Sequence, residues 1–258
     1  MFDPKKLAFF LPNTFTALNI ACGFASVIYS FQYKFEQAAL ILLLGALFDS
    51  VDGRIARLTG TQSPFGEQFD SLSDVISFGV APAMLVYQKF LINLGRPGLV
   101  VAFIYLLCGA LRLARFNANI KKINPSFFQG LPIPGGAMAM IGLVLFAEEF
   151  EIINDFTPAI FLYILAYSLL MISNIWFYSF KKSEWLSRHK KTLLFSIFIL
   201  FSVLYTSYEY AIFVFINIYT VGSLYYFMRN KGRLEDVFEW SHESDSEGEN
   251  DNVVESQK

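Results

Sequence analysis

The stretches DSVDGRIAR at residues 49–57 and GEQFDSLSD at residues 66–74 decide how the rest of this sequence folds. Their four aspartates border strongly apolar segments: Asp49 and Asp52 follow one, and Asp70 and Asp74 open the next. The whole chain is 55% hydrophobic and 16% charged, whereas an ordinary soluble domain carries about 25% charged residues. This composition predicts a polytopic membrane protein, in which ionisable groups at membrane depth are costly and usually functional.

Charge and cysteine content exclude several other classes of protein. Lys and Arg number 20 against 22 Asp and Glu, so a basic nucleic-acid binder is excluded and we expect no nucleic-acid partner. The two cysteines, Cys22 and Cys108, lie in apolar stretches and are interpreted as packing residues rather than as a disulfide scaffold. We therefore expect the lipid bilayer to be the chain's main environment.

The fold class expected is all-α: a polytopic transmembrane helical bundle of about eight spans, since each crossing needs about 20 mostly apolar residues. Residues 1–230 would form the integral membrane domain, and the acidic tail at residues 231–258 would be disordered. The candidate spans are roughly 12–32, 37–58, 69–92, 97–116, 132–150, 157–180, 191–206 and 209–228.

The distribution of Lys and Arg predicts the orientation. Apart from Lys34, Lys89 and Arg96, every basic residue falls on the side of the N-terminus or in the tail. Basic residues are retained on the cytoplasmic side. We therefore expect both termini in the cytoplasm, and a site that faces the cytoplasm from the cell (inner) membrane.

The spacing of the aspartates predicts a metal site. Asp49 and Asp52 are three residues apart and Asp70 and Asp74 are four apart, so each pair lies on one face of its helix. A short connection makes the two helices antiparallel neighbours, and four carboxylates would converge. Oxygen ligands suit Mg²⁺, Mn²⁺ or Ca²⁺, and two such ions can activate a phosphate ester or anhydride.

Residues between the aspartates favour a phosphate-containing ligand. Gly53 would let a ligand approach the helix backbone, and the Arg57 guanidinium can pair with phosphate. Gly66 precedes the second helix, and Thr61 heads a group of neutral donors in the loop. The sequence therefore predicts a polar head group bound beside the metal ions.

The full pattern, D-x2-D-G-x2-A-R-x8-G-x3-D-x3-D, resembles the signature of the CDP-alcohol phosphatidyltransferase family at every defining position. The resemblance implies a helical membrane enzyme that transfers the phosphatidyl group of a CDP-linked lipid to an alcohol and releases CMP. It also implies two Mg²⁺ or Mn²⁺ ions as the cofactor. The family resemblance further implies a homodimer. The metal ligands carried over are Asp49, Asp52 and Asp70, with Asp74 as the general base that shares in metal binding. The CDP-binding residues are Gly53, Arg57 and Gly66.

Three further stretches resemble the bacterial and archaeal membrane-type phosphatidylserine synthases within this family: LPNT at 11–14, GALRLARFN at 109–117 and FQGLPIPG at 128–135. This implies CDP-diacylglycerol and L-serine as substrates. Arg112 and Arg115 offer cations to an acceptor carboxylate, with Asn117 beside them, although both arginines could instead anchor the helix at lipid phosphates. Asn13 could contact the pyrophosphate or cytidine, or cap a helix.

Other functions remain open on the sequence alone. Within the family, phosphatidylglycerophosphate or inositol-phosphate synthesis is the main alternative. An ion-coupled transporter would spread its acidic residues over several helices near the midplane. A membrane prenyltransferase would place two acidic motifs far apart in the sequence. Here the carboxylates cluster on two adjacent helices beside Arg57, which favours phosphatidyl transfer.

Overall fold

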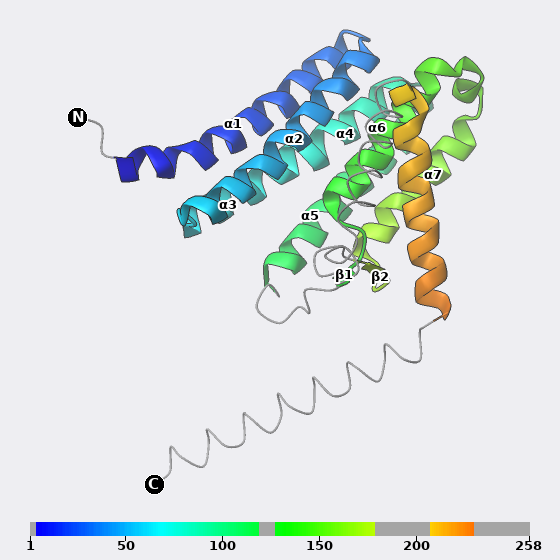
Figure 1. Ribbon diagram of the computed structural model, residues 1–258. Coiled ribbons are helices and arrows are strands. Elements are labelled where there is room, and N and C mark those ends of the chain that lie inside the picture. The colour runs from blue at the N-terminus through cyan, green and yellow to red at the C-terminus, as the bar shows by residue number, and fades with distance from the viewer. Residues whose placement is uncertain (1–3, 119–126, 179–206, 230–258) are drawn as a thin grey trace.

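The computed structural model describes residues 4–118, 127–178 and 207–229, and almost all of them are helical (Figure 1). This confirms the predicted helical fold class. The helices are α1 (Pro4–Phe31), α2 (Phe35–Thr59), α3 (Pro64–Asp74), η1 (Val75–Val80), α4 (Ala81–Val86), η2 (Tyr87–Leu91), η3 (Ile92–Leu94), α5 (Arg96–Ala118), α6 (Ile133–Glu149), η4 (Glu151–Asp155), α7 (Thr157–Ile172) and the unlabelled helix Ser207–Arg229.

A tight turn between α2 and α3 reverses the chain at the quoted motif. Helix α2 ends at Gly60, whose left-handed backbone (φ 65°) lets its N–H bond the carbonyl of Ala56. Ser63 then caps α3, because its Oγ accepts a hydrogen bond from the Gly66 N–H at 3.0 Å, and Pro64 occupies the first helical position. The predicted antiparallel arrangement of the two aspartate-bearing helices is thereby confirmed.

From α3 the helix continues without a break through η1, α4 and η2 to Leu94. The segments η1 and η2 are π-helical, so each widens the helix locally, and η1 begins directly after Asp74. Tyr105 of α5 donates a hydrogen bond to the Phe78 carbonyl at 3.0 Å, which ties α5 to this widened turn. Such π turns occur often at functional sites.

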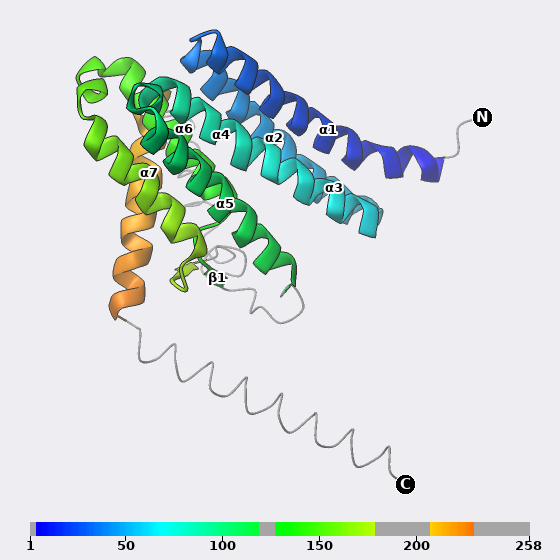
Figure 2. The ribbon, with the colours of Figure 1, turned by 180° about the vertical axis from the view of Figure 1, so that it is seen from behind.

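The apolar core lies around α6, most of whose side chains are buried. Gly142 on α6 faces the helix Ser207–Arg229, where an added Cβ would lie 2.9 Å from the Phe213 backbone. Two short strands, β1 (Phe127–Gln129) and β2 (Trp176–Tyr178), pair antiparallel near the C-terminal ends of α5 and α7. Figures 1 and 2 show α1, α2 and α3–α4 running side by side, with α5, α6 and α7 packed beyond them.

Four helices among the described residues are long and apolar enough to cross a membrane: Phe10–Phe31, Pro64–Leu94, Arg96–Ala118 and Ser207–Arg229. The eight-span count stays a prediction. Helix α2 carries the charged residues of the motif, and α6 and α7 are shorter, with 17 and 16 residues. The predicted span 157–180 is too long, because α7 ends at Ile172 and the chain turns into β2. The predicted span 191–206 and the tail lie outside the described residues.

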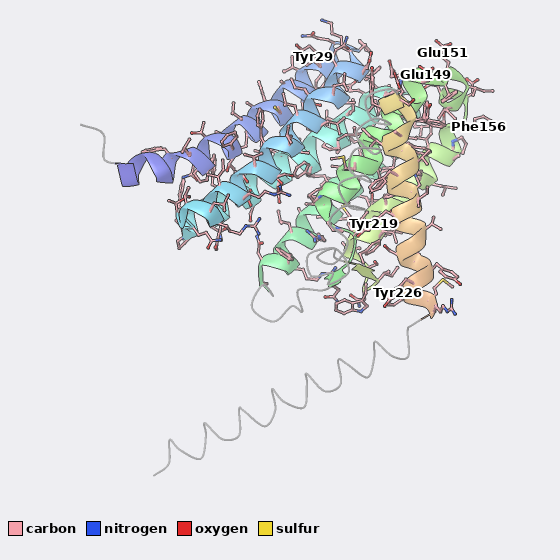
Figure 3. The ribbon with its side chains drawn as sticks, in the orientation of Figure 1. Tyr29, Glu149, Glu151, Phe156, Tyr219 and Tyr226 are labelled. Carbon is pink, nitrogen blue, oxygen red and sulfur yellow. The ribbon has the colours of Figure 1, made fainter. Side chains whose placement is uncertain are left out.

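The helices place distinct residues at the two ends of the bundle. Tyr29, Glu149 and Glu151 lie toward one end (Figure 3), where Lys89 also pairs with Glu148. The α2–α3 turn and the C-terminal end of α5 lie toward the other. The motif aspartates and the arginines of α5 therefore belong to the same end of the bundle, as their positions in the sequence predict.

Candidate metal and nucleotide site

Three of the predicted carboxylates meet between α2 and α3. One ligand oxygen from each of Asp49, Asp70 and Asp74 lies within 4.8 Å of the others, and all three residues are partly buried. Asp70 Oδ1 and Asp74 Oδ1 are buried without a hydrogen-bond partner. Ionised carboxylates so close together repel one another. Orphaned oxygens in an oxygen-only group fit a divalent cation such as Mg²⁺ or Mn²⁺.

Asp52 lies next to this group but is held differently. It is 4% exposed, and its Oδ2 accepts a hydrogen bond from the Thr16 hydroxyl at 2.9 Å. It is close enough to Asp70 and Asp49 to interact with both electrostatically. The structure thus brings all four predicted ligands into one region, with three in a tight group and Asp52 at its side.

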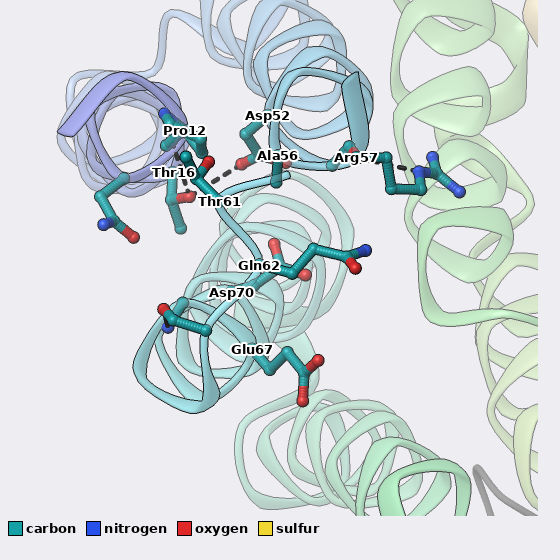
Figure 4. Close-up of a pocket in the computed structure, with 13 residues that line it drawn as sticks. Pro12, Thr16, Asp52, Ala56, Arg57, Thr61, Gln62, Glu67 and Asp70 are labelled. Atoms are coloured by element: carbon teal, nitrogen blue, oxygen red, sulfur yellow. Dashed lines mark hydrogen bonds between the residues drawn. The ribbon is translucent and has the colours of Figure 1, made fainter. Parts of the chain in front are cut away.

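A cavity of about 360 Å³ opens beside the carboxylates, between α1, the end of α2 and the start of α3 (Figure 4). Its size is suited to a small polar ligand. Asp70, which also belongs to the carboxylate group, lines the cavity together with Asp52. All five residues predicted to bind CDP line it: Asn13, Gly53, Arg57, Thr61 and Gly66.

Local backbone structure explains how these residues reach the cavity. The side chain of Arg57 is exposed, and a hydrogen bond from its Nε to the Gly53 carbonyl at 2.9 Å fixes its direction. At Gly66 an added Cβ would lie 3.3 Å from Ser63 Oγ and 3.6 Å from Asn13 Oδ1, so a side chain here would crowd the helix cap and the cavity wall. The glycine therefore keeps this corner open.

The three residues predicted to bind the acceptor have different surroundings. Arg112 is 6% exposed, its Nε has no hydrogen-bond partner, and its guanidinium lies over the Phe116 ring and interacts electrostatically with Asp74. Arg115 instead donates to the carbonyls of Gln129, Ile172 and Ser173, at 3.1–3.2 Å. Asn117 donates to Ser71 Oγ at 2.9 Å on the exposed side. Only Arg112 is thus placed beside the carboxylate group.

Two residues that hydrogen-bond the aspartates of α2 were missing from the sequence analysis. Thr16 bonds Asp52, and the buried Asn19 donates from Nδ2 to Asp49 Oδ1 at 3.3 Å. A signal for them does exist: Asn13, Thr16 and Asn19 are polar residues at three-residue intervals in a segment that is otherwise apolar apart from Thr14, which places them along one helix face.

A sequence model of CDP-alcohol phosphatidyltransferases matches residues 9–176, which contain every residue of the candidate site. The chain belongs to the CDP-alcohol phosphatidyltransferase family. The resemblance drawn from the aspartate motif is thereby confirmed, and the protein is a transferase of this family.

The chain is similar to several proteins whose names state an activity. The chain is 37% identical to a CDP-diacylglycerol–serine O-phosphatidyltransferase of Helicobacter pylori, over 84% of this chain and 91% of the relative. It is 42% identical to one of Methanocaldococcus jannaschii, over 68% and 76% of the two chains. An archaetidylserine synthase of Methanothermobacter thermautotrophicus is 40% identical over 68% and 73%.

Proposed function

We propose that this phosphatidyltransferase uses L-serine as its acceptor: it moves the phosphatidyl group from CDP-diacylglycerol to the serine hydroxyl and releases CMP. The observation that carries the proposal is the cavity beside the carboxylate group, which gathers the five predicted nucleotide residues next to three acidic side chains. The activity named for the relatives in bacteria and archaea supports serine as the acceptor.

The nucleotide end of the lipid would occupy the cavity. Arg57 would pair with phosphate, while Asn13 and Thr61 supply neutral hydrogen bonds, and the glycines at 53 and 66 leave room for the ligand. Asp49, Asp52, Asp70 and Asp74 would hold two Mg²⁺ or Mn²⁺ ions. Bound there, the ions would neutralise the pyrophosphate and stabilise the charge on departing CMP.

Asp74 would act on the acceptor. It belongs to the carboxylate group but does not line the cavity, so it can face the serine rather than the nucleotide. Asp74 takes the hydroxyl proton as the serine oxygen forms a bond to the phosphorus that carries diacylglycerol. The bond from that phosphorus to the bridging oxygen breaks, and CMP leaves with the electron pair.

Arg112 would recognise the carboxylate of serine. Its buried Nε lacks a hydrogen-bond partner and its charge lies near Asp74. The carboxylate of a serine bound there would accept that hydrogen bond. Arg115 and Asn117 stay predicted acceptor residues with less support, because α7 carbonyls and Ser71 already engage them.

The setting proposed is the cell (inner) membrane, with the site and both termini on the cytoplasmic side, eight spans in all, and a homodimer. Arg57 and Arg112 lie at the site end of the bundle, whereas Glu149 and Glu151 lie at the opposite end. This distribution follows the preference of basic residues for the cytoplasmic side.

The test is CMP release by the purified protein with CDP-diacylglycerol and Mn²⁺, given serine, glycerol 3-phosphate or inositol in turn. The expected result is release with serine alone. Release with another acceptor would overturn the assignment of serine and keep the family's reaction. Undiminished release in EDTA would contradict the proposed metal site.

A further inference from the structure

One face of α1 is buried and polar where it crosses the site. Thr16 is 3% exposed and Asn19 is fully buried. Polar groups are rarely buried in a membrane helix without a partner inside the protein. The partners here are the predicted metal ligands themselves, which makes this face more than a packing surface.

Each of the two side chains holds an aspartate of α2. Thr16 Oγ1 donates to Asp52 Oδ2 at 2.9 Å, as the dashed line in Figure 4 shows, and Asn19 Nδ2 donates to Asp49 Oδ1 at 3.3 Å. The Thr16 hydroxyl also lies 3.2 Å from the Pro12 carbonyl. The shorter contact, to the charged acceptor, is the stronger one.

The backbone of the same two residues holds the other aspartate helix. Ser73 donates to the Thr16 carbonyl at 3.3 Å, and Ser77 donates to the Asn19 carbonyl at 3.0 Å. These serines flank Asp74, and both are buried. The side chains of these two α1 residues therefore bond the carboxylates of α2, and their backbone carbonyls bond the segment that bears Asp74. In this way α1 links the two aspartate-bearing helices.

Close packing makes this arrangement specific. An added Cβ at Gly45, one turn before Asp49, would lie 2.9 Å from Asn19 Oδ1, and one at Gly23 would lie 2.8 Å from Ser77 Oγ. Small residues at both positions let the helices approach until the polar contacts form. The amide of Asn19 must point its nitrogen at Asp49, because an ionised carboxylate only accepts hydrogen bonds.

We propose that Thr16 and Asn19 are positioning residues for the metal site, orienting Asp52 and Asp49 from α1. The inference rests on the proposed metal role of those aspartates. Groups that hydrogen-bond a ligating side chain typically contribute about 10- to 100-fold to metal affinity or activity. Thr16 also lines the cavity, but neither residue needs to touch the metal or the substrate to have this effect.

The experiment measures Mn²⁺ binding to the purified full-length protein by the electron paramagnetic resonance signal of free Mn²⁺, with no lipid or serine present. Thr16→Val removes the hydroxyl at nearly constant size, and Thr16→Ser restores it. Thr14→Val is the matched control, since Thr14 lies on the exposed side of α1 and bonds only the Phe10 carbonyl in its own helix. Melting temperatures in EDTA monitor the fold.

Thr16→Val should weaken Mn²⁺ binding about 10-fold or more, with the melting temperature in EDTA close to that of the wild type. Thr16→Ser and Thr14→Val should bind Mn²⁺ as the wild type does. Asn19→Leu should act in the same direction as Thr16→Val. Should Thr16→Val fail to fold, a loss of Mn²⁺ binding in Asn19→Leu that Thr14→Val does not share, with the melting temperature in EDTA unchanged, would carry the test.

Two results would overturn the proposal, and they are distinguishable. If the wild type binds Mn²⁺ and Thr16→Val and Asn19→Leu bind it equally well, α1 only packs and the proposed metal site stands. If the wild type itself binds no Mn²⁺, both the inference and the metal part of the proposed function fail.

Discussion

Replacing Asp74 by asparagine should separate catalysis from binding of the nucleotide lipid. The change keeps the size of the side chain and removes its ability to take a proton. Asp74 belongs to the carboxylate group and lies near Arg112, but it does not line the cavity that would hold the nucleotide. At saturating Mn²⁺ we therefore expect the affinity for CDP-diacylglycerol to stay close to that of the wild type, because no wall of the cavity changes and three of the four aspartates remain to hold the ions.

The expected loss falls on turnover. A positioned general base contributes about 10²- to 10⁴-fold to rate, which corresponds to about 3 to 6 kcal/mol of activation free energy at ~1.4 kcal/mol per tenfold. CMP release at saturating serine and Mn²⁺ measures turnover, and the binding of a fluorescent CDP-diacylglycerol analogue measures affinity.

Asp70→Asn supplies the contrast. Asp70 is in the same carboxylate group but also lines the cavity, so both turnover and lipid binding should fall. Loss of lipid binding in Asp74→Asn as large as in Asp70→Asn would refute the division of roles between these two residues. Retained turnover in Asp74→Asn would refute the assignment of Asp74 as the base.

Further predictions concern the acceptor, the metal, a glycine and the tail. Arg112→Gln should raise the KM for serine at least about 10-fold with little change in lipid binding, because its buried Nε is free to bond the serine carboxylate. Arg115→Gln should mainly lower the melting temperature, because Arg115 bonds carbonyls at the end of α7. Equal effects of the two variants on the KM for serine would contradict this difference in roles. Chelation with EDTA should abolish activity and added Mn²⁺ or Mg²⁺ should restore it, as CMP release would report. Gly66→Ala should weaken lipid binding several-fold, since its Cβ would lie 3.3 Å from Ser63 Oγ; wild-type affinity would show that the corner is not used. Truncation after Arg233 should leave CMP release near the wild-type rate, and an inactive truncation would show that the acidic tail has a role in the enzyme.

The convergence of the aspartates was predictable because helix periodicity and a short connection leave little freedom. Residues three or four apart share a face, and the Gly60 and Ser63 signals that close the turn are local. Four of the five predicted nucleotide residues follow from the same geometry, since Gly53, Arg57, Thr61 and Gly66 belong to the motif that this turn folds back on itself, whereas Asn13 comes from α1. The structure confirms this reversal of the chain but corrects one boundary: α3 begins at Pro64, so Gly66 lies in its first turn and does not precede the helix.

The π turns after Asp74 and the end of α7 were not predictable in the same way. Hydropathy does not distinguish an α turn from a wider one, so η1 leaves no sequence signal. An apolar run beyond Ile172 predicts a continued helix, yet the chain leaves the helix there and forms β2 against β1. Tertiary contacts decided both, because local propensity is a weak constraint when packing opposes it.

The two arginines of α5 show most clearly where sequence reasoning stops. Both are basic, three residues apart and at the same helix end, so the sequence assigns them the same role. Their partners differ because α7 ends beside one of them: its last carbonyls have no helical partner, and Arg115 satisfies them. One turn earlier, Arg112 has no such carbonyls within reach of its Nε and lies near Asp74 instead. The end of α7 therefore engages Arg115 and leaves Arg112 available for the serine carboxylate proposed above. Because the sequence alone does not show where α7 ends, it cannot distinguish the two arginines.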